Sequence, residues 1–513
     1  LQWCALNDVD EAFPSLLVSD GDMSAIIRVD GDGSQVPASM DLCMTYLEDI
    51  ADETGVQSIM TYVSSWATRA GWHFYVDHSR RLQEQGSALG THTAHHRLSE
   101  LVTDEEYEAE LDGSKEEIRS NLASRGYDPG EIRFLVNPGN GAAMHNYGRF
   151  AEKFDFFLTH GLDQSLPVAY GVLTWFTDGK PFPVANDGPS PDYQWFYDST
   201  WSYTTPEVAD YEWLVLDHLC NNVGNGVIFN AMWHDYGMSK MLAGEPRNVT
   251  EIIRNGTRII NDSNWEYYEV MRNFWNTHDI YCPEPAELAG KMLLQAGASL
   301  SWTREDGVLT VRIAFPEEDF GKYAKYVGGM ALGLNGASIA SVELDGQAYY
   351  AFSDDKVILP VPDSPEMTLR IHEGHAGPAP RLVYSSKVLS GIFMENGMLT
   401  ADFSTRSTAR FRFVTDKPSV VLGASSFSAA YDGNSVSGRL EGSGSVSLLP
   451  VESSVTIHSS TLPFKSVRVT SEGLEVTLVG NGARHNTIVY SDGNGYRTMT
   501  VPGFEGEKTV IIK

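Results

Sequence analysis

Residues 87–96 read Ser-Ala-Leu-Gly-Thr-His-Thr-Ala-His-His, and the rest of the chain can be read outward from them. The run 87–90 is typical of a short strand, and His92 and His96 follow it four positions apart. On a helical turn this spacing places both imidazoles on one face, close enough to share one metal ion. Because a His pair at this spacing is more often a surface feature, the interpretation depends on the segments around it.

The segments upstream predict an α/β layer. Apolar runs and helical periodicity give the order strand, helix, strand, helix, strand at residues 24–29, 39–54, 56–63, 79–85 and 87–90. This order predicts parallel strands whose carboxyl ends share one edge of the sheet. Asp30, Asp32, His92 and His96 all follow strand ends, so we expect them at that edge, where α/β sheets place their chemistry.

These four residues suit a metal-assisted hydrolase. Two neutral imidazoles and one carboxylate leave coordination positions open for water and substrate. A metal bound there polarises a carbonyl and lowers the pKa of its water, and a second carboxylate can accept the water's proton. Asp30 and Asp32 could divide the two carboxylate roles. The alternative is an ordinary pair of Asp-Gly turns in "VDGDG" (29–33).

The His-Thr-x-x-His element, approached by strand and helix from an aspartate pair, resembles the NodB-type polysaccharide deacetylases. The resemblance covers about residues 20–240 and implies a distorted (β/α) barrel, a divalent metal (Zn, Mn or Co) and hydrolysis of acetyl groups on sugars. It also implies that Asp30 is the catalytic base and that Asp32, His92 and His96 are the metal ligands.

The aspartate pair departs from the usual family pattern. In the family the two aspartates are usually adjacent, whereas here Gly31 separates them. Asp8 and Asp10 in "LNDVDEA" form a rival pair near the start of the sequence. We prefer Asp30 and Asp32, because one helix and one strand then separate the pair from the third strand, as in the family.

The segment "IRFLVNPGNG" (132–141) stands where the family has an Arg-x-Pro-aromatic motif that lines the groove, although the pattern is altered. The resemblance implies substrate-binding roles for Arg133, Asn137 and Asn140. The alternative is an ordinary type II turn at Pro138-Gly139.

A late apolar strand, "GVIFNAMW" (226–233), leads into His234. It resembles the family segment whose histidine protonates the leaving amine, so we expect His234 to be the catalytic acid. Trp233 and Trp195 are candidate substrate-binding aromatics. Asp198, near Trp195, is the candidate partner that orients the histidine.

Charge and composition limit the classes of partner. The formal net charge of −31 disfavours nucleic acid and anionic membrane surfaces. No apolar run is long enough to span a bilayer. The four cysteines show no metal-knuckle or disulfide-scaffold spacing. We expect a secreted or cell-surface protein with a glycan or glycoconjugate partner and no membrane insertion.

The composition changes near residue 295. Short strand-like runs separated by Gly, Ser, Asn and Asp turns follow it, which predicts β-sandwich modules at 296–380 and 381–513. Residues 1–295 are expected to form the catalytic domain, with a helical extension from residue 240. The fold class is therefore α/β plus all-β, and the C-terminal modules are candidates for carbohydrate binding.

Three functions remain at this point. The leading hypothesis is an amino-sugar deacetylase that cleaves a linear amide C–N bond. The altered motifs indicate a divergent branch, for which terminal N-acetylgalactosamine of glycans such as the A antigen is a candidate substrate. One alternative is a glycoside hydrolase using paired carboxylates such as Asp198 and Asp217. The other is a non-catalytic carbohydrate-binding protein.

Overall fold

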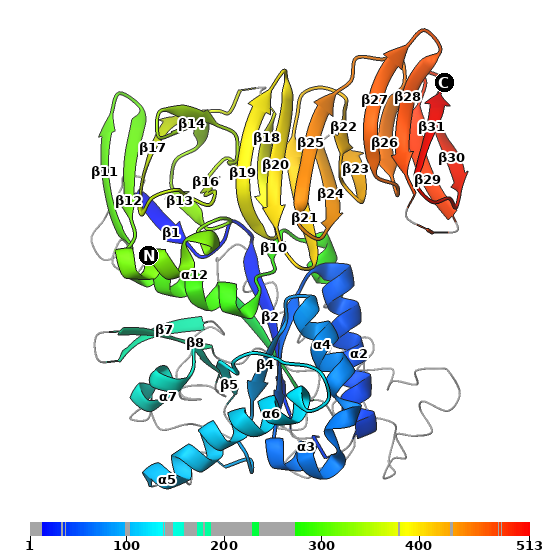
Figure 1. Cartoon of the computed structure of the whole chain (residues 1–513). Helices are drawn as coiled ribbons and strands as arrows, with labels where there is room; N and C mark the ends of the chain where they lie inside the picture. Colours follow the sequence, from blue (N-terminus) through cyan, green and yellow to red (C-terminus); the bar gives the residue numbers. More distant parts are fainter. Residues whose placement is uncertain are drawn as a thin grey trace, which may run out of the picture. The chain divides into compact units, whose positions relative to one another are not determined.

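The computed structural model describes residues 13–31, 34–35, 37–97, 103–136, 138, 147–158, 172–177, 180–185, 228–234, 272–377, 380–430, 434–480, 482–483 and 485–513. The chain divides into two compact units (Figure 1). One is Asp22–Ala296, and the other joins Leu1–Gly21 to Gly297–Lys513. We expected residues 1–295 to form one domain. Strand β1 (Phe13–Leu17) instead pairs antiparallel with β13 (Ala331–Asn335).

The unit Asp22–Ala296 is built on a parallel sheet, as the sequence predicted. Its central strands lie in the order β2 (Met23–Asp30), β3 (Gln57–Tyr62), β4 (Ala88–Thr91), β5 (Phe134–Val136) and β6 (Phe156–Leu158). Each of them runs parallel to its neighbours.

The remaining strands extend this sheet at both of its ends. The antiparallel hairpin of β7 (Val172–Thr177) and β8 (Lys180–Ala185) extends it beyond β6. At the other end, β9 (Ile228–His234) and the short β10 (Ile280–Tyr281) pair in parallel with β2. Cα atoms of β7 and β9 approach within 8 Å. The strands therefore follow one another around a distorted (β/α) barrel.

Helices connect the strands, as parallel pairing requires. In chain order the described ones are α2 (Pro37–Thr54), α3 (Ser64–Ala70), the 3₁₀ turn η1 (Trp72–Phe74), α4 (Val76–Glu84), α5 (Asp104–Tyr107), the π-helical η2 (Glu108–Asp112), α6 (Gly113–Ala123), α7 (Tyr147–Lys153) and α12 (Pro285–Gly297). None of the described helices is long and apolar enough to cross a membrane.

The core of this unit explains the predicted elements. All eight residues of β2 are buried, as expected of a parallel strand covered on both faces. Helix α2 buries Met40, Met44 and Leu47 against the sheet and ends before Gly55, whose φ of 79° suits a residue without Cβ. Cys43 and Cys282 are both buried in this core.

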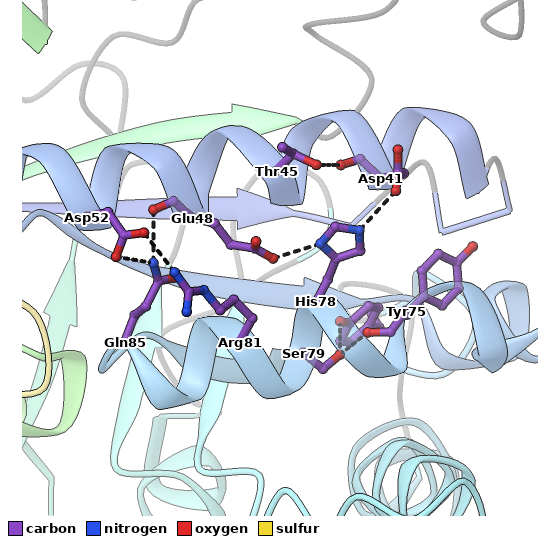
Figure 2. Close-up of polar contacts among 10 residues, drawn as sticks. Asp41, Thr45, Glu48, Asp52, Tyr75, His78, Ser79, Arg81 and Gln85 are labelled. Atoms are coloured by element: carbon purple, nitrogen blue, oxygen red, sulfur yellow. Dashed lines mark hydrogen bonds and ion pairs between the residues drawn. The ribbon is translucent and has the colours of Figure 1, made fainter. Parts of the chain in front are cut away.

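Polar contacts hold α4 against α2 (Figure 2). The His78 ring lies between two carboxylates of α2: Nδ1 is 2.7 Å from Glu48 Oε1, and Nε2 is 2.9 Å from Asp41 Oδ1. One turn further along α4, Arg81 Nη2 donates to Asp52 Oδ2 at 2.8 Å. The hydrogen bond to Glu48 raises the pKa of His78 above its ordinary value. The bond to Asp41 adds to the rise, and burial opposes it.

This contact should make the stability of the barrel unit depend on pH. The His78 imidazolium contributes its full stabilisation below about pH 6.5, the ordinary pKa in the unfolded chain. That contribution is lost as the pH rises through the raised pKa of the folded state. The variant His78→Gln should therefore lower the urea midpoint most at acidic pH. Tryptophan fluorescence can follow the transition, since nine of the eleven tryptophans lie in residues 22–296.

The matched control is Arg81→Gln, which breaks the neighbouring contact between the same two helices. The guanidinium stays charged throughout this pH range, so the effect of this variant should be constant with pH. A His78→Gln effect that is equally constant, or that grows as the pH rises, would contradict the prediction.

In the described residues of the second unit the strands pair antiparallel, apart from single parallel bridges between Leu422 and Phe464 and between Ala351 and Leu382. Strand β13 lies between β1 and β16 (Lys356–Ile358) in a three-stranded sheet. A five-stranded sheet has the order β11 (Ser299–Glu305), β12 (Val308–Ala314), β17 (Glu366–Glu373), β14 (Ile339–Leu344) and β15 (Gln347–Tyr349). The helices α13 (Glu317–Tyr323) and η4 (Ala324–Tyr326) follow β12.

The C-terminal part of this unit is a β-sandwich. One seven-stranded sheet has the order β18 (Arg381–Ser385), β21 (Thr408–Val414), β24 (Ser435–Glu441), β23 (Ser426–Ala430), β26 (Thr456–Ser460), β29 (His485–Ser491) and β30 (Tyr496–Pro502). The other has the order β19 (Val388–Glu395), β20 (Met398–Ser404), β25 (Gly444–Pro450), β22 (Ser419–Leu422), β27 (Phe464–Thr470), β28 (Gly473–Val479) and β31 (Glu507–Ile512). Phe403 packs on Phe411 and Phe427 packs on Phe464 across the two sheets, at centroid distances of 5.8 and 5.2 Å.

Candidate functional site

The carboxyl ends of the parallel strands bring the expected catalytic residues to one rim of the barrel. Asp30, the last residue of β2, stands in register with His234, the last residue of β9. Strands β3 and β4 lie on the other side of β2. They end at Tyr62 and Thr91, which are paired with each other. The His pair begins directly after Thr91, so it shares this rim with Asp30 and with the backbone of His234.

The His pair lies in a loop, not on the helical turn that its spacing suggested. Residues 92–97 are non-helical, and Thr93 and His96 have φ values of 63° and 62°. This left-handed conformation costs about 1–2 kcal/mol for a residue with a side chain. The rings of His92 and His96 are nevertheless adjacent, with centroids 4.9 Å apart and planes at 62°. The two rings are therefore adjacent because of a tight loop and not because of helical periodicity.

The residues 92–96, called the His loop below, are anchored to neighbouring backbone. The first two N–H groups of α3, those of Ser64 and Ser65, donate to the carbonyls of Thr93 and Ala94 at 3.2 and 3.1 Å. The hydroxyl of Thr91 accepts from the Thr93 N–H at 2.9 Å. These bonds help to offset the cost of the left-handed residues.

His92 is buried, and its tautomer is set by the next strand. Its Nδ1 lies 3.0 Å from the carbonyl oxygen of Val136, the last residue of β5, and the side chain is about 1% exposed. A carbonyl only accepts, so Nδ1 carries the hydrogen and Nε2 carries the lone pair. This is the arrangement in which metal-binding histidines are usually held.

His96 is half-buried and lies between two rings. Trp66 of α3 stacks on it, with centroids 5.6 Å apart and planes at 16°, and His92 contacts it edge-on. Trp66 could not be chosen from the sequence, because only the fold brings α3 beside the His loop.

Asp30 is held by a buried arginine. Arg28 Nε donates to Asp30 Oδ1 at 2.8 Å and Nη2 donates to Oδ2 at 2.7 Å, and the two side chains are 0% and 1% exposed. Residues two apart on a strand point to the same face, so β2 itself aligns this two-pronged pair. Sequence reasoning missed Arg28. The signal that could have found it is its position two residues before the strand-end aspartate, which places both side chains on the same face of the strand.

The turn after Asp30 lies over the end of β3. A Cβ at Gly31 would stand 2.2 Å from the carbonyl oxygen of Thr61, so only glycine fits. The Ser34 hydroxyl donates to the Gly31 carbonyl at 2.5 Å and accepts from the Val63 N–H at 3.2 Å. Asp32, the expected carboxylate ligand, lies outside the described residues.

The structure does not bring Arg133 to this rim. Arg133 precedes β5, at the amino end of a parallel strand, whereas the rim is formed by carboxyl ends. Its guanidinium pairs with Asp155 and, at 3.1 Å, with Glu131. The arginine therefore stands at the start of β5 rather than at its end.

Other expected residues lie partly or wholly outside the described residues. For Trp233 and His234 the structure describes the backbone of β9 but not the side chains. The remaining candidates are all outside: Asp8, Asp10, Asn137, Asn140, Trp195, Asp198 and Asp217.

The chemistry of the His pair fits a divalent metal. Two adjacent imidazoles, one of them fixed with its lone pair on Nε2, are ligands that suit Zn, Mn or Co. Within the described part of the chain, no cluster of three or more His, Cys, Asp or Glu side chains is placed to hold a metal ion. The expected third ligand, Asp32, is not in that part.

Comparison with known proteins gives structural neighbours only. No protein-family model matches this sequence, and no curated protein matches it. Among solved structures, a Mycobacterium smegmatis protein assigned as a polysaccharide deacetylase is 13% identical, with a TM-score of 0.39 over 58% of this chain and 100% of its own.

Two further neighbours also act on carbohydrates. Agd3, a carbohydrate deacetylase, is 12% identical, with a TM-score of 0.38 over 69% of this chain and 66% of its own. A family 4 carbohydrate esterase from Streptomyces lividans is 13% identical, with a TM-score of 0.26 over 47% of this chain and 91% of its own. The structural neighbours thus include polysaccharide deacetylases at low sequence identity.

Proposed function

We propose that this protein hydrolyses an N-acetyl group on a carbohydrate with the help of a divalent metal, releasing acetate and an amino sugar. The proposal is supported by the residues that lie together at the rim of the barrel. The adjacent rings of His92 and His96 follow β4, and Asp30 ends β2 in register with His234 on β9. A metal-binding pair and an acid–base pair therefore follow the ends of strands in one sheet.

The residues would divide the work as follows. A divalent cation held by His92, His96 and Asp32 would polarise the acetyl carbonyl and acidify its water. Asp30, whose carboxylate Arg28 orients through two hydrogen bonds, would accept the proton of the attacking water. His234 donates a proton to the departing nitrogen, so that the amine leaves as a neutral group.

The choice of sugar is a finer part of the proposal. Terminal N-acetylgalactosamine, as in the A antigen, is the first substrate class to test, followed by other N-acetylated glycans. Such substrates are extracellular, which agrees with a secreted or cell-surface protein. The C-terminal sandwich is proposed to bind the same glycans, with Trp195, Trp233, Asn137 and Asn140 as substrate contacts in the barrel.

Acetate release from a panel of N-acetylated glycans tests the proposal. We expect release by the full chain, loss of release after EDTA treatment, and recovery on adding Zn²⁺, Mn²⁺ or Co²⁺. His92→Ala should abolish the metal dependence together with the activity. Asp30→Asn and His234→Ala should each lower kcat by about 10²–10⁴-fold, the usual contribution of a general base or acid.

The control is His73→Ala, which removes an exposed histidine of η1 and should leave acetate release unchanged. Acetate release that survives EDTA and His92→Ala would overturn the proposal. Glycosidic cleavage without acetate release would instead indicate a glycoside hydrolase. Glycan binding without any product would indicate a carbohydrate-binding protein.

A further inference from the structure

Glu110 contacts the centre of the His loop through all three of its oxygens. Its backbone carbonyl accepts from the Ala94 N–H at 3.0 Å. Its carboxylate accepts from the His95 N–H through Oε2 at 2.8 Å, and Oε1 lies 2.8 Å from His95 Nδ1. The two contacted residues stand between His92 and His96, so Glu110 holds the part of the loop that sets the separation of the two rings.

The position of Glu110 is unusual for a glutamate. Its side chain is about 5% exposed, and a carboxylate so deeply buried is unfavourable unless hydrogen bonds compensate it. It lies in the π-helical segment η2, between α5 and α6. Such π segments are rare and frequently occur at functional sites. His95, in contrast, has a side chain that is 60% exposed, so its ring is not part of the core.

The loop needs such a partner because of its backbone conformation. Thr93 and His96 both have positive φ without being glycine, and the bonds from α3 reach only the carbonyl side of the loop. Glu110 accepts from the N–H side, at two successive residues. The two sets of bonds together fix the loop from both sides.

We propose that Glu110 is a positioning residue that holds His92 and His96 in the arrangement that binds the metal. The inference rests on the proposed function, because it concerns the same metal site. Glu110 acts through His95 and Ala94 and does not itself touch the metal or the substrate.

The chemistry of the contact explains why a carboxylate is needed. The His loop presents two donors, the His95 N–H and the His95 ring N–H, and a carboxylate can accept from both. A glutamine of the same shape keeps one accepting oxygen, which is neutral, and its NH₂ group can meet the ring only if the His95 proton moves from Nδ1 to Nε2. Glu110→Gln should therefore disturb the loop with little change in volume.

Titration of the metal-free full chain with Zn²⁺, followed by calorimetry, tests the inference. Residues that orient metal ligands typically contribute about 10–100-fold to metal affinity, so we expect Glu110→Gln to weaken Zn²⁺ binding by that factor. The visible absorption spectrum of the Co²⁺-loaded protein should also change, since it reports the geometry of the ligands. The urea midpoint of the metal-free variant verifies that the barrel is still folded.

A second variant tests whether the effect follows the hydrogen bonds. Glu110→Leu removes both side-chain acceptors at a similar volume, so we expect it to bind Zn²⁺ more weakly than Glu110→Gln. The matched control, Glu108→Gln, changes an exposed glutamate of the same π-helical segment and should bind like the wild type.

The outcomes separate the two proposals. If the wild type binds Zn²⁺ and His92→Ala does not, but Glu110→Gln binds as tightly as the wild type, the role of Glu110 is overturned and the metal site stands. Zn²⁺ binding by Glu110→Leu that equals the binding of the wild type would likewise contradict action through the loop. If the wild type binds no divalent metal, or His92→Ala binds as well as the wild type, the proposed function fails and the inference fails with it.

Discussion

Replacing Arg28 with methionine should lower the free energy of unfolding of the barrel unit by about 3–5 kcal/mol. Arg28 and Asp30 are both buried at the carboxyl end of β2 and joined by two hydrogen bonds. Methionine fills a similar space but removes the cation, which leaves the buried Asp30 carboxylate without its guanidinium. Urea unfolding followed by tryptophan fluorescence measures the loss.

The matched control is the same substitution at a half-buried surface arginine. Arg80 pairs with Asp77 at 3.4 Å on the surface of α4, and its side chain is 40% exposed. Arg80→Met should change the unfolding free energy by no more than about 0.5 kcal/mol. Equal losses of unfolding free energy in Arg28→Met and Arg80→Met would show that the buried pair of Arg28 and Asp30 contributes little to stability. In the double variant Arg28→Met/Asp30→Asn, the loss should be smaller than the sum of the two single losses.

The order of strands and helices around the barrel could be predicted because it depends on local signals. The strand at 24–29, the helix ending before Gly55 and the strand leading to the His pair all appear in the structure within a few residues of their expected bounds. Short apolar runs and helix-stopping glycines mark such elements in the sequence itself. The parallel order then follows from the alternation, and it places Asp30 and His92 at one rim.

The conformation of the His loop could not be predicted in the same way. A four-residue spacing is compatible with a helical turn, and nothing in the sequence marks Thr93 and His96 as left-handed residues. The loop conformation is imposed by distant partners, namely the start of α3 and the buried Glu110. Contacts between segments far apart in the chain leave no local signature.

Arg133 and the N-terminal strand β1 illustrate two other limits of prediction from the sequence. Arg133 stands one residue before its strand, so an error of a few residues moves a side chain from one end of the barrel to the other. Strand β1 joins the second unit through pairing with β13, more than three hundred residues later in the chain. Neither strand ends nor pairing partners can be read from periodicity alone.

Gly31, in the turn after β2, has no room for a Cβ atom. Its φ is outside the left-handed region, so the need for glycine is purely steric. An added Cβ would lie 2.2 Å from Thr61 O, 2.8 Å from Thr61 C and 3.0 Å from Tyr62 Cα. All three are backbone atoms of the central strand β3, which cannot move without disturbing its pairing with β2 and β4. The turn that begins at Asp30 would have to move instead.

Gly31→Ala should therefore affect activity even more than stability. Overpacking of this kind costs about 1–3 kcal/mol, whereas a displacement of about 1 Å in a catalytic group can lower the rate about 100-fold. The control Gly113→Ala adds a methyl group at the start of α6, where the nearest atom is 3.7 Å away. That substitution should leave acetate release unchanged and stabilise the chain slightly, because alanine favours a helix. Wild-type acetate release by Gly31→Ala would show that the turn after β2 can shift without cost, and the assignment of the base to Asp30 would then lose its main geometric support.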